Sequence, residues 1–141
     1  MKALVLVLFS AVRAIDYSSC YNIACSACGV GYEKHVISTL RSAILFDDGE
    51  KPLCFHIFAE DFLHERISAG MEDLRSLSPH VFSYRLYSIT YPDELTDKEQ
   101  NTWKNMFRPC STQRLFIPLL LKDVPHLVYF NVWRYFDLQN K

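Results

Sequence analysis

The fold class follows from the pattern of residues 21–46, YNIACSACGVGYEKHVISTLRSAILF. Residues 21–27 form a short apolar run of the kind that makes a buried strand, and Gly29 and Gly31 follow it as a turn. Beyond the turn, apolar side chains recur at the spacing of one helix face, at Val36, Ile37, Leu40, Ile44 and Leu45. The segment therefore predicts a strand, a turn and a helix over residues 33–46.

The rest of the chain repeats this alternation. We predict further strands over residues 53–59, 82–89 and 127–130, helices over 62–77 and 112–121, and a partly helical polar stretch at 91–105. Pro118 should end or kink the last helix. Strands separated by helices favour a mostly parallel sheet with flanking helices, a Rossmann-like α/β fold, in which ligands gather beyond the carboxyl ends of the strands.

The composition is that of one packed globular domain. Half of the 141 residues are hydrophobic and 14% are aromatic, which is enough to build a substantial core. The formal net charge is −1, and acidic and basic residues are interleaved. Because the chain has no basic face for phosphate backbones and no polybasic run for an anionic membrane, we expect no nucleic-acid partner.

The amino terminus resembles a secretory leader. Lys2 precedes an apolar run over residues 3–12, and small residues surround Arg13 at the positions that a signal peptidase reads. The run is too short to span a bilayer, which needs about 20 residues. We interpret residues 1–14 as a signal peptide or short anchor, with membrane attachment left open; the alternative is a buried first strand.

The five cysteines allow more than one interpretation. Their odd number does not suggest a disulfide-stapled miniprotein, although one or two disulfides could form in an oxidising lumen. Cys25 and Cys28 have the spacing of a dithiol oxidoreductase, but Gly29 and Gly31 separate them from the following helix. We keep a redox role as an alternative to simple packing cysteines.

Acidic and histidine side chains surround the end of the second predicted strand. On a continuous helix, His56, Glu60 and His64 would share one face and could hold a metal. Residues 53–59 are predicted to be a strand, so we expect an interior His56 instead. Glu60 and Asp61 would then lie on the ligand side of the sheet as possible polar contacts.

Arg114 is a candidate ligand-binding residue, after the cysteines and the acidic and histidine side chains described above. It lies on a largely apolar predicted helix close to the fourth strand, where a guanidinium could hold a diphosphate with its fork of donors. The alternative is a solvated surface arginine.

Five motifs, taken together, resemble a known family. They are IACSACG with LRSAILF, LCFHIFAED, YRLYSITYP and WKNMFRPCSTQRLFIPLLLKDVPHLVYF, in this order. Over residues 21–130 they resemble the N-terminal half of the glucoside xylosyltransferases, in glycosyltransferase family eight. The resemblance implies a GT-A type nucleotide-sugar domain, here as a truncated, partial domain.

The resemblance also implies a chemistry. Members of the family use UDP-xylose and a divalent metal, usually Mn²⁺, to add xylose to O-linked glucose on the EGF-like repeats of glycoproteins such as Notch. They act in the endoplasmic reticulum or Golgi lumen. Ala27, Cys28 and Gly29 match the strand end whose backbone meets the nucleotide, and Arg114 matches an arginine near the donor.

The family's metal ligands are missing after the fourth strand. There the family has one apolar residue and then Asp-x-Asp, whereas this chain has Phe130 and then Asn131, Val132 and Trp133. An amide is a weak, uncharged ligand and an indole provides none. We therefore interpret residues 131–141 as a divergent tail and expect no metal binding and no xylosyl transfer.

Three other outcomes remain open at this stage. The chain could be a non-catalytic module that keeps UDP-sugar affinity through Gly29 and Arg114. It could be the dithiol oxidoreductase described above. It could also lack a stable fold, because the strand at 127–130 would leave an unpaired sheet edge.

Overall fold

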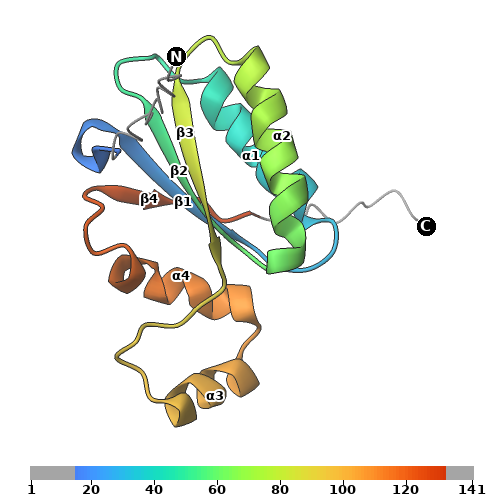
Figure 1. Ribbon diagram of the computed structural model, residues 1–141, viewed down its shortest axis with the longest axis vertical. Coiled ribbons are helices and arrows are strands. Elements are labelled where there is room, and N and C mark those ends of the chain that lie inside the picture. The colour runs from blue at the N-terminus through green and yellow to red at the C-terminus, as the bar shows by residue number, and fades with distance from the viewer. Residues whose placement is uncertain (1–14, 133–141) are drawn as a thin grey trace, which may run out of the picture.

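The computed structural model describes residues 15–132 (Figure 1). The expected leader at residues 1–14 and most of the expected tail, residues 133–141, lie outside this part of the chain. None of the helices between residues 15 and 132 is long and apolar enough to span a membrane.

The chain alternates strands and helices, as the sequence predicts. The strands are β1 (Tyr21–Ala27), β2 (Leu53–Ala59), β3 (Phe82–Ser88) and β4 (Leu127–Tyr129). The helices are α1 (Tyr32–Leu45), α2 (His64–Leu77), α3 (Asp97–Met106) and α4 (Pro109–Leu120), with short 3-10 turns η1 (Tyr17–Ser19) and η2 (Asp61–Leu63). The sheet has the order β3-β2-β1-β4, and every pairing is parallel, which confirms the predicted α/β fold.

The last helix differs most from its prediction. It begins at Pro109 rather than at residue 112, because a proline is readily accommodated in the first helical turn, where no amide partner is needed. It also runs two residues past Pro118, to Leu120, so the missing proline amide falls within the final turn. The longer helix brings Cys110 into its first turn, which matters for the site.

Helices α1 and α2 cover one face of the sheet (Figure 1). The inward-facing side chains of both helices meet those of β1 and β2 in a dry core that includes Val36, Leu40, Ile67, Met71, Ile23, Phe55 and Ile57. The helices pack closely: a Cβ on Gly70 would lie 2.7 Å from Ile37. Because this core holds both helices against the strands, it fixes the turns at the strands' carboxyl ends.

The opposite face is covered in part by α4 and has a more polar interior. Around β1 and β4, Ala24 and Phe58 pack against Ile117 and Leu121 of α4. Toward β3, the fully buried His56 lies 3.1 Å from the Tyr87 hydroxyl and 3.3 Å from Asn22 Oδ1. The interior position predicted for His56 is therefore confirmed.

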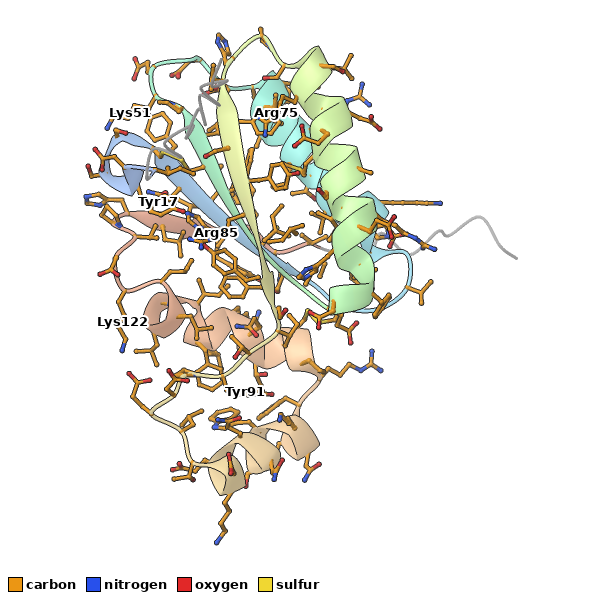
Figure 2. The ribbon with its side chains drawn as sticks, in the orientation of Figure 1. Tyr17, Lys51, Arg75, Arg85, Tyr91 and Lys122 are labelled. Carbon is orange, nitrogen blue, oxygen red and sulfur yellow. A yellow bond between two sulfur atoms is a disulfide. The ribbon has the colours of Figure 1, made fainter. Side chains whose placement is uncertain are left out.

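The charge state of His56 is set by its surroundings. Burial, and secondarily the positive charge of Arg85, lower the pKa of His56 to about 4. Arg85 lies beside Tyr17 on this face of the sheet (Figure 2). His56 is therefore neutral near physiological pH.

Strand β4 lies at the edge of the sheet. Within the described residues it pairs only with β1, which agrees with the unpaired edge expected from the sequence. Val128 is about half exposed there, at 54%.

Candidate functional site at the carboxyl edge of the sheet

The turn after β1 forms the centre of the candidate site. Parallel strands bring their carboxyl ends to one edge of the sheet. Strand β1 ends at this edge with Ala27, and Cys28 and Gly29 follow it. Gly29 has a φ of 98° and Gly31 one of 89°, in the left-handed region that favours glycine. The three residues predicted to meet a nucleotide thus lie where the fold presents ligands, in a sharply turned backbone.

Two acidic residues follow β2 at the same edge, as expected. The Glu60 amide donates to the carbonyl of Ala27 at 3.2 Å, and Glu60 Oε2 accepts from the Gly29 amide at 2.7 Å. Asp61 accepts a hydrogen bond from the Ser88 hydroxyl at 2.6 Å, which ties it to the end of β3. Glu60 is therefore part of the turn after β1, whereas Asp61 faces β3.

A disulfide fastens this turn to α4. Cys28 is bonded to Cys110, 82 residues later in the chain, with a Cα–Cα distance of 5.8 Å. The dithiol alternative is therefore wrong, because Cys28 is paired with Cys110 and not with Cys25. Burial raises the pKa of the Cys25 thiol to about 12, so Cys25 is protonated and unreactive.

Arg114 lies on the same helix as Cys110. Arg114 follows Cys110 by four residues, so both lie on the same side of α4. The Arg114 side chain is exposed and lines a hollow between α4 and β4, together with Tyr129 and Lys122. Lys122, which follows α4 (Figure 2), forms an ion pair with Glu94 in the loop before α3. The Cys28–Cys110 bond thus links the predicted nucleotide turn to the helix that carries the predicted donor arginine.

Ser26 and Tyr129 are site residues that the sequence analysis missed. Their hydroxyl groups lie 2.6 Å apart, joining β1 to β4 just before the edge. Burial raises the pKa of Tyr129, and the Ser26 hydrogen bond and the Arg114 charge partly oppose that change. A serine near the end of a buried strand was the available signal, but its partner depends on the pairing of strands far apart in sequence.

Gln113 connects α4 to the loop after β3. Its side chain is buried, and its Oε1 accepts from the Thr90 amide at 3.0 Å. The neighbouring Tyr91 packs between α3 and α4, with its ring 5.5 Å from that of Phe116 (Figure 2). Both contacts hold the start of α4, and with it Cys110, against the carboxyl edge.

The amino end of α1 already carries a negative charge. Glu33, in the first turn, is buried and pairs with Arg66 at 3.3 Å. Its own backbone amide, and to a lesser degree Arg66, lower the pKa of the Glu33 carboxyl, while burial acts in the opposite direction. Because Glu33 already places a carboxylate against this helix end, a diphosphate would be repelled from it.

The described residues after β4 do not suit a divalent metal. The Phe130 amide donates to the carbonyl of Ala24 at 2.8 Å, Asn131 is exposed, and Val132 is buried with the α1–α2 core. Asn131 offers a single amide oxygen, and Trp133 lies outside the described residues. Between residues 15 and 132, no group of three or more His, Cys, Asp or Glu side chains could surround a metal ion.

A second disulfide lies at the opposite end of the sheet. Cys20, which precedes β1, is bonded to Cys54 of β2, and the two are 34 residues apart in sequence. It closes a shorter loop than the Cys28–Cys110 bond and does not touch the candidate site.

Comparison with known proteins identifies relatives of this arrangement. No family model matches the chain, and no solved structure matches it either. Glucoside xylosyltransferase 1 of Gallus gallus is 46% identical over 114 residues, which are 79% of this chain and 24% of the relative. The enzyme of the same name from Homo sapiens is 44% identical over 108 residues, 77% of this chain and 22% of the relative.

A differently numbered relative agrees with these two. Glucoside xylosyltransferase 2 of Xenopus laevis is 39% identical over 108 residues, 77% of this chain and 24% of the relative. The chain thus spans about a quarter of the length of the curated relatives it matches, rather than the half expected from the sequence. Over most of its own length, the chain is a homologue of the glucoside xylosyltransferases.

Proposed function

We propose that the chain binds UDP-xylose at the carboxyl edge of its sheet and does not itself transfer the xylose. The observation that carries the proposal is the Cys28–Cys110 disulfide, which links the turn that contains Gly29 to the helix that carries Arg114, in a chain homologous to xylosyltransferases. Arg114 is an exposed cation with a fork of donors that suits a diphosphate. The turn at Ala27, Cys28 and Gly29, whose Ala27 carbonyl and Gly29 amide bond to Glu60, would lie against the nucleoside.

The lack of transfer follows from the residues after β4. In the resembling family, two aspartates at positions 131 and 133 would hold Mn²⁺, which helps the UDP leaving group to depart. Asn131 and Trp133 supply one neutral oxygen and no carboxylate. Without that charge neutralisation the chain keeps binding groups but lacks the means to stabilise departing UDP.

The cellular setting and the acceptor are part of the proposal. Two disulfides are typical of an oxidising compartment, which supports the lumen of the endoplasmic reticulum or Golgi. The acceptor of a full-length relative would be O-linked glucose on EGF-like repeats of a glycoprotein, as the resemblance implies. This chain would share the donor with such enzymes and not the transfer step.

Calorimetric titration of the full chain with UDP-xylose, UDP-glucose and CDP tests the binding. We expect saturable binding of both UDP-sugars in the micromolar to millimolar range and markedly weaker binding of CDP. Circular dichroism of the same sample establishes that it is folded. A folded chain that binds no UDP-sugar at millimolar concentration would contradict the proposal.

A transfer assay tests the second half. The full chain is incubated with labelled UDP-xylose, Mn²⁺ and a glucosylated EGF-like repeat, beside a full-length glucoside xylosyltransferase as the positive control. We expect no labelled repeat from the chain. Xylosylation above the no-enzyme background would show that groups other than residues 131 and 133 support the reaction.

A further inference from the structure

Glu60 is held in an unusual way for a partly exposed acid. Its amide and its carboxylate both bond to the turn after β1, at the Ala27 carbonyl and the Gly29 amide. Within the described residues it forms no ion pair, unlike Glu33, which pairs with Arg66, or Glu94, which pairs with Lys122. Its charge is therefore not neutralised by a neighbouring side chain.

Half of the carboxylate is left for another donor. Oε2 accepts from the Gly29 amide at 2.7 Å, whereas no described residue donates to Oε1. A carboxylate has about four acceptor sites on its two oxygens, and the side chain is only partly buried. Glu60 thus presents a fixed, anionic acceptor to whatever lies over the turn.

The position of Glu60 indicates which part of a nucleotide it would meet. It directly follows β2, beside the glycine turn that follows β1. In doubly wound sheets that bind NAD, an acidic residue some way beyond the glycine turn accepts a hydrogen bond from a ribose hydroxyl, and Glu60 is an acid beside such a turn. A carboxylate attracts hydroxyl donors and repels phosphate, so the Glu60 side chain suits the sugar of a nucleoside better than its diphosphate.

We propose that Glu60 binds the ribose hydroxyls of the donor nucleotide, with Gly29 holding the carboxylate in place. This inference rests on the proposed UDP binding. It also orients the nucleotide: the ribose lies over the ends of β1 and β2, and the diphosphate extends toward Arg114 beside α4 and β4.

The test combines one substitution with one altered ligand. Glu60→Gln keeps an acceptor for the Gly29 amide but removes the charge, and 2′-deoxy-UDP removes one ribose donor. Glu50→Gln is the matched control, because the Glu50 carboxylate also accepts a single hydrogen bond, in its case from the Tyr21 hydroxyl at 3.3 Å, but Glu50 follows α1 at the other end of the sheet. The full chain and both variants are titrated with UDP and 2′-deoxy-UDP by calorimetry.

We expect Glu60→Gln to weaken UDP binding about tenfold, and the natural chain to bind 2′-deoxy-UDP about tenfold more weakly than UDP. The Glu60→Gln variant should distinguish the two ligands by less than about threefold, because the interaction is already lost. Glu50→Gln should bind UDP like the natural chain.

Several results would overturn the inference. If Glu60→Gln still prefers UDP over 2′-deoxy-UDP by the natural factor, Glu60 does not contact the ribose. If the variant instead loses its discrimination against N3-methyl-UDP, the carboxylate binds the uracil. If the natural chain binds no UDP, the proposed function fails and this inference fails with it, whereas UDP binding that is unchanged in Glu60→Gln overturns the inference alone.

Discussion

The two ends of the ligand edge, beyond β1 and beyond β4, are built very differently. Beyond β1, the turn at Gly29 is held by a disulfide, by the Glu60 carboxylate and by the fit of α4 to the sheet. Beyond β4, Phe130 makes one backbone hydrogen bond and Asn131 is exposed, with an amide where the family would have a carboxylate. The contrast motivates the proposal that nucleotide binding and metal binding are separable within one fold.

The turn beyond β1 is held by contacts between residues that are far apart in the sequence. The Cys28–Cys110 bond joins two segments that lie 82 residues apart, and it links the turn after β1 to the helix that carries Arg114. The second end has no comparable link among the described residues. Substitution after β4 therefore need not disturb the nucleotide turn, which is what the separation of binding from transfer requires.

Removing the Cys28–Cys110 disulfide should have the largest effect, because it should lower both the stability of the chain and its affinity for UDP. Cys28→Ser with Cys110→Ser frees a long loop and should lower the free energy of unfolding by roughly 3–5 kcal/mol. It should also weaken UDP binding by about tenfold, because the turn and Arg114 are no longer held together. Urea unfolding and UDP titration measure the two effects.

The second disulfide is the matched control. Cys20→Ser with Cys54→Ser should also destabilise the chain, somewhat less because its loop is shorter. Measured in conditions where it remains folded, this variant should bind UDP normally. Equal losses of UDP affinity in both pairs would mean that the Cys28–Cys110 bond has no special role at the site.

Protonation of His56 should weaken the sheet beneath both ends. Its pKa is about 4 in the folded chain and about 6.5 when unfolded, so the unfolded state binds the proton first as the pH falls. Stability from this group is present above about pH 6.5 and is lost toward pH 4, by on the order of 2–3 kcal/mol. Urea unfolding at a series of pH values measures the loss.

The His56 effect is isolated by substitution. His56→Gln should flatten the pH dependence of unfolding between pH 4.5 and 7 relative to the natural chain, whereas His80→Gln, at an exposed site, should leave it unchanged. Carboxylates contribute equally to all three chains and cancel in the comparison. A His56→Gln variant with the natural pH dependence would refute the assigned role.

Substitution of Arg114 should give the smallest of the three effects, and it should change the affinity for UDP without changing the fold. Arg114→Gln is expected to weaken UDP binding about tenfold through loss of a charged hydrogen-bond donor to the diphosphate, and Arg114→Lys to recover part of that loss. Uridine lacks the phosphates, so its weaker binding should not change. Arg41→Gln, on α1, is the control; equal effects on UDP and uridine would place Arg114 elsewhere.

The sequence predicts the local parts of this architecture well. The strand, glycine turn and helix at residues 21–46 follow from spacing alone, because each depends on near neighbours in the chain. The interior His56 follows from the strand around it. The edge position of Ala27, Cys28, Gly29 and Glu60 follows from the general geometry of parallel sheets.

The long-range parts could not be predicted in the same way. The pairing of Cys28 with Cys110 cannot be deduced from cysteine spacing, and the Cys25-x-x-Cys28 pattern suggested a different chemistry. The bond between Glu60 and Gly29 depends on the register of β1 and β2. The early start of α4 depends on Pro109 in its first turn, which the spacing of the apolar residues over 112–121 does not reveal.

If nucleotide binding has been kept while the metal ligands have been lost, the affinity of the chain for UDP should not depend on manganese. UDP is titrated into the natural chain and into an Asn131→Asp, Trp133→Asp double variant, each with EDTA or with millimolar Mn²⁺. We predict that the natural chain binds UDP equally within about twofold in both conditions, and that Mn²⁺ strengthens binding to the double variant by at least about tenfold. Manganese-dependent UDP binding by the natural chain would show that its metal ligands have not been lost.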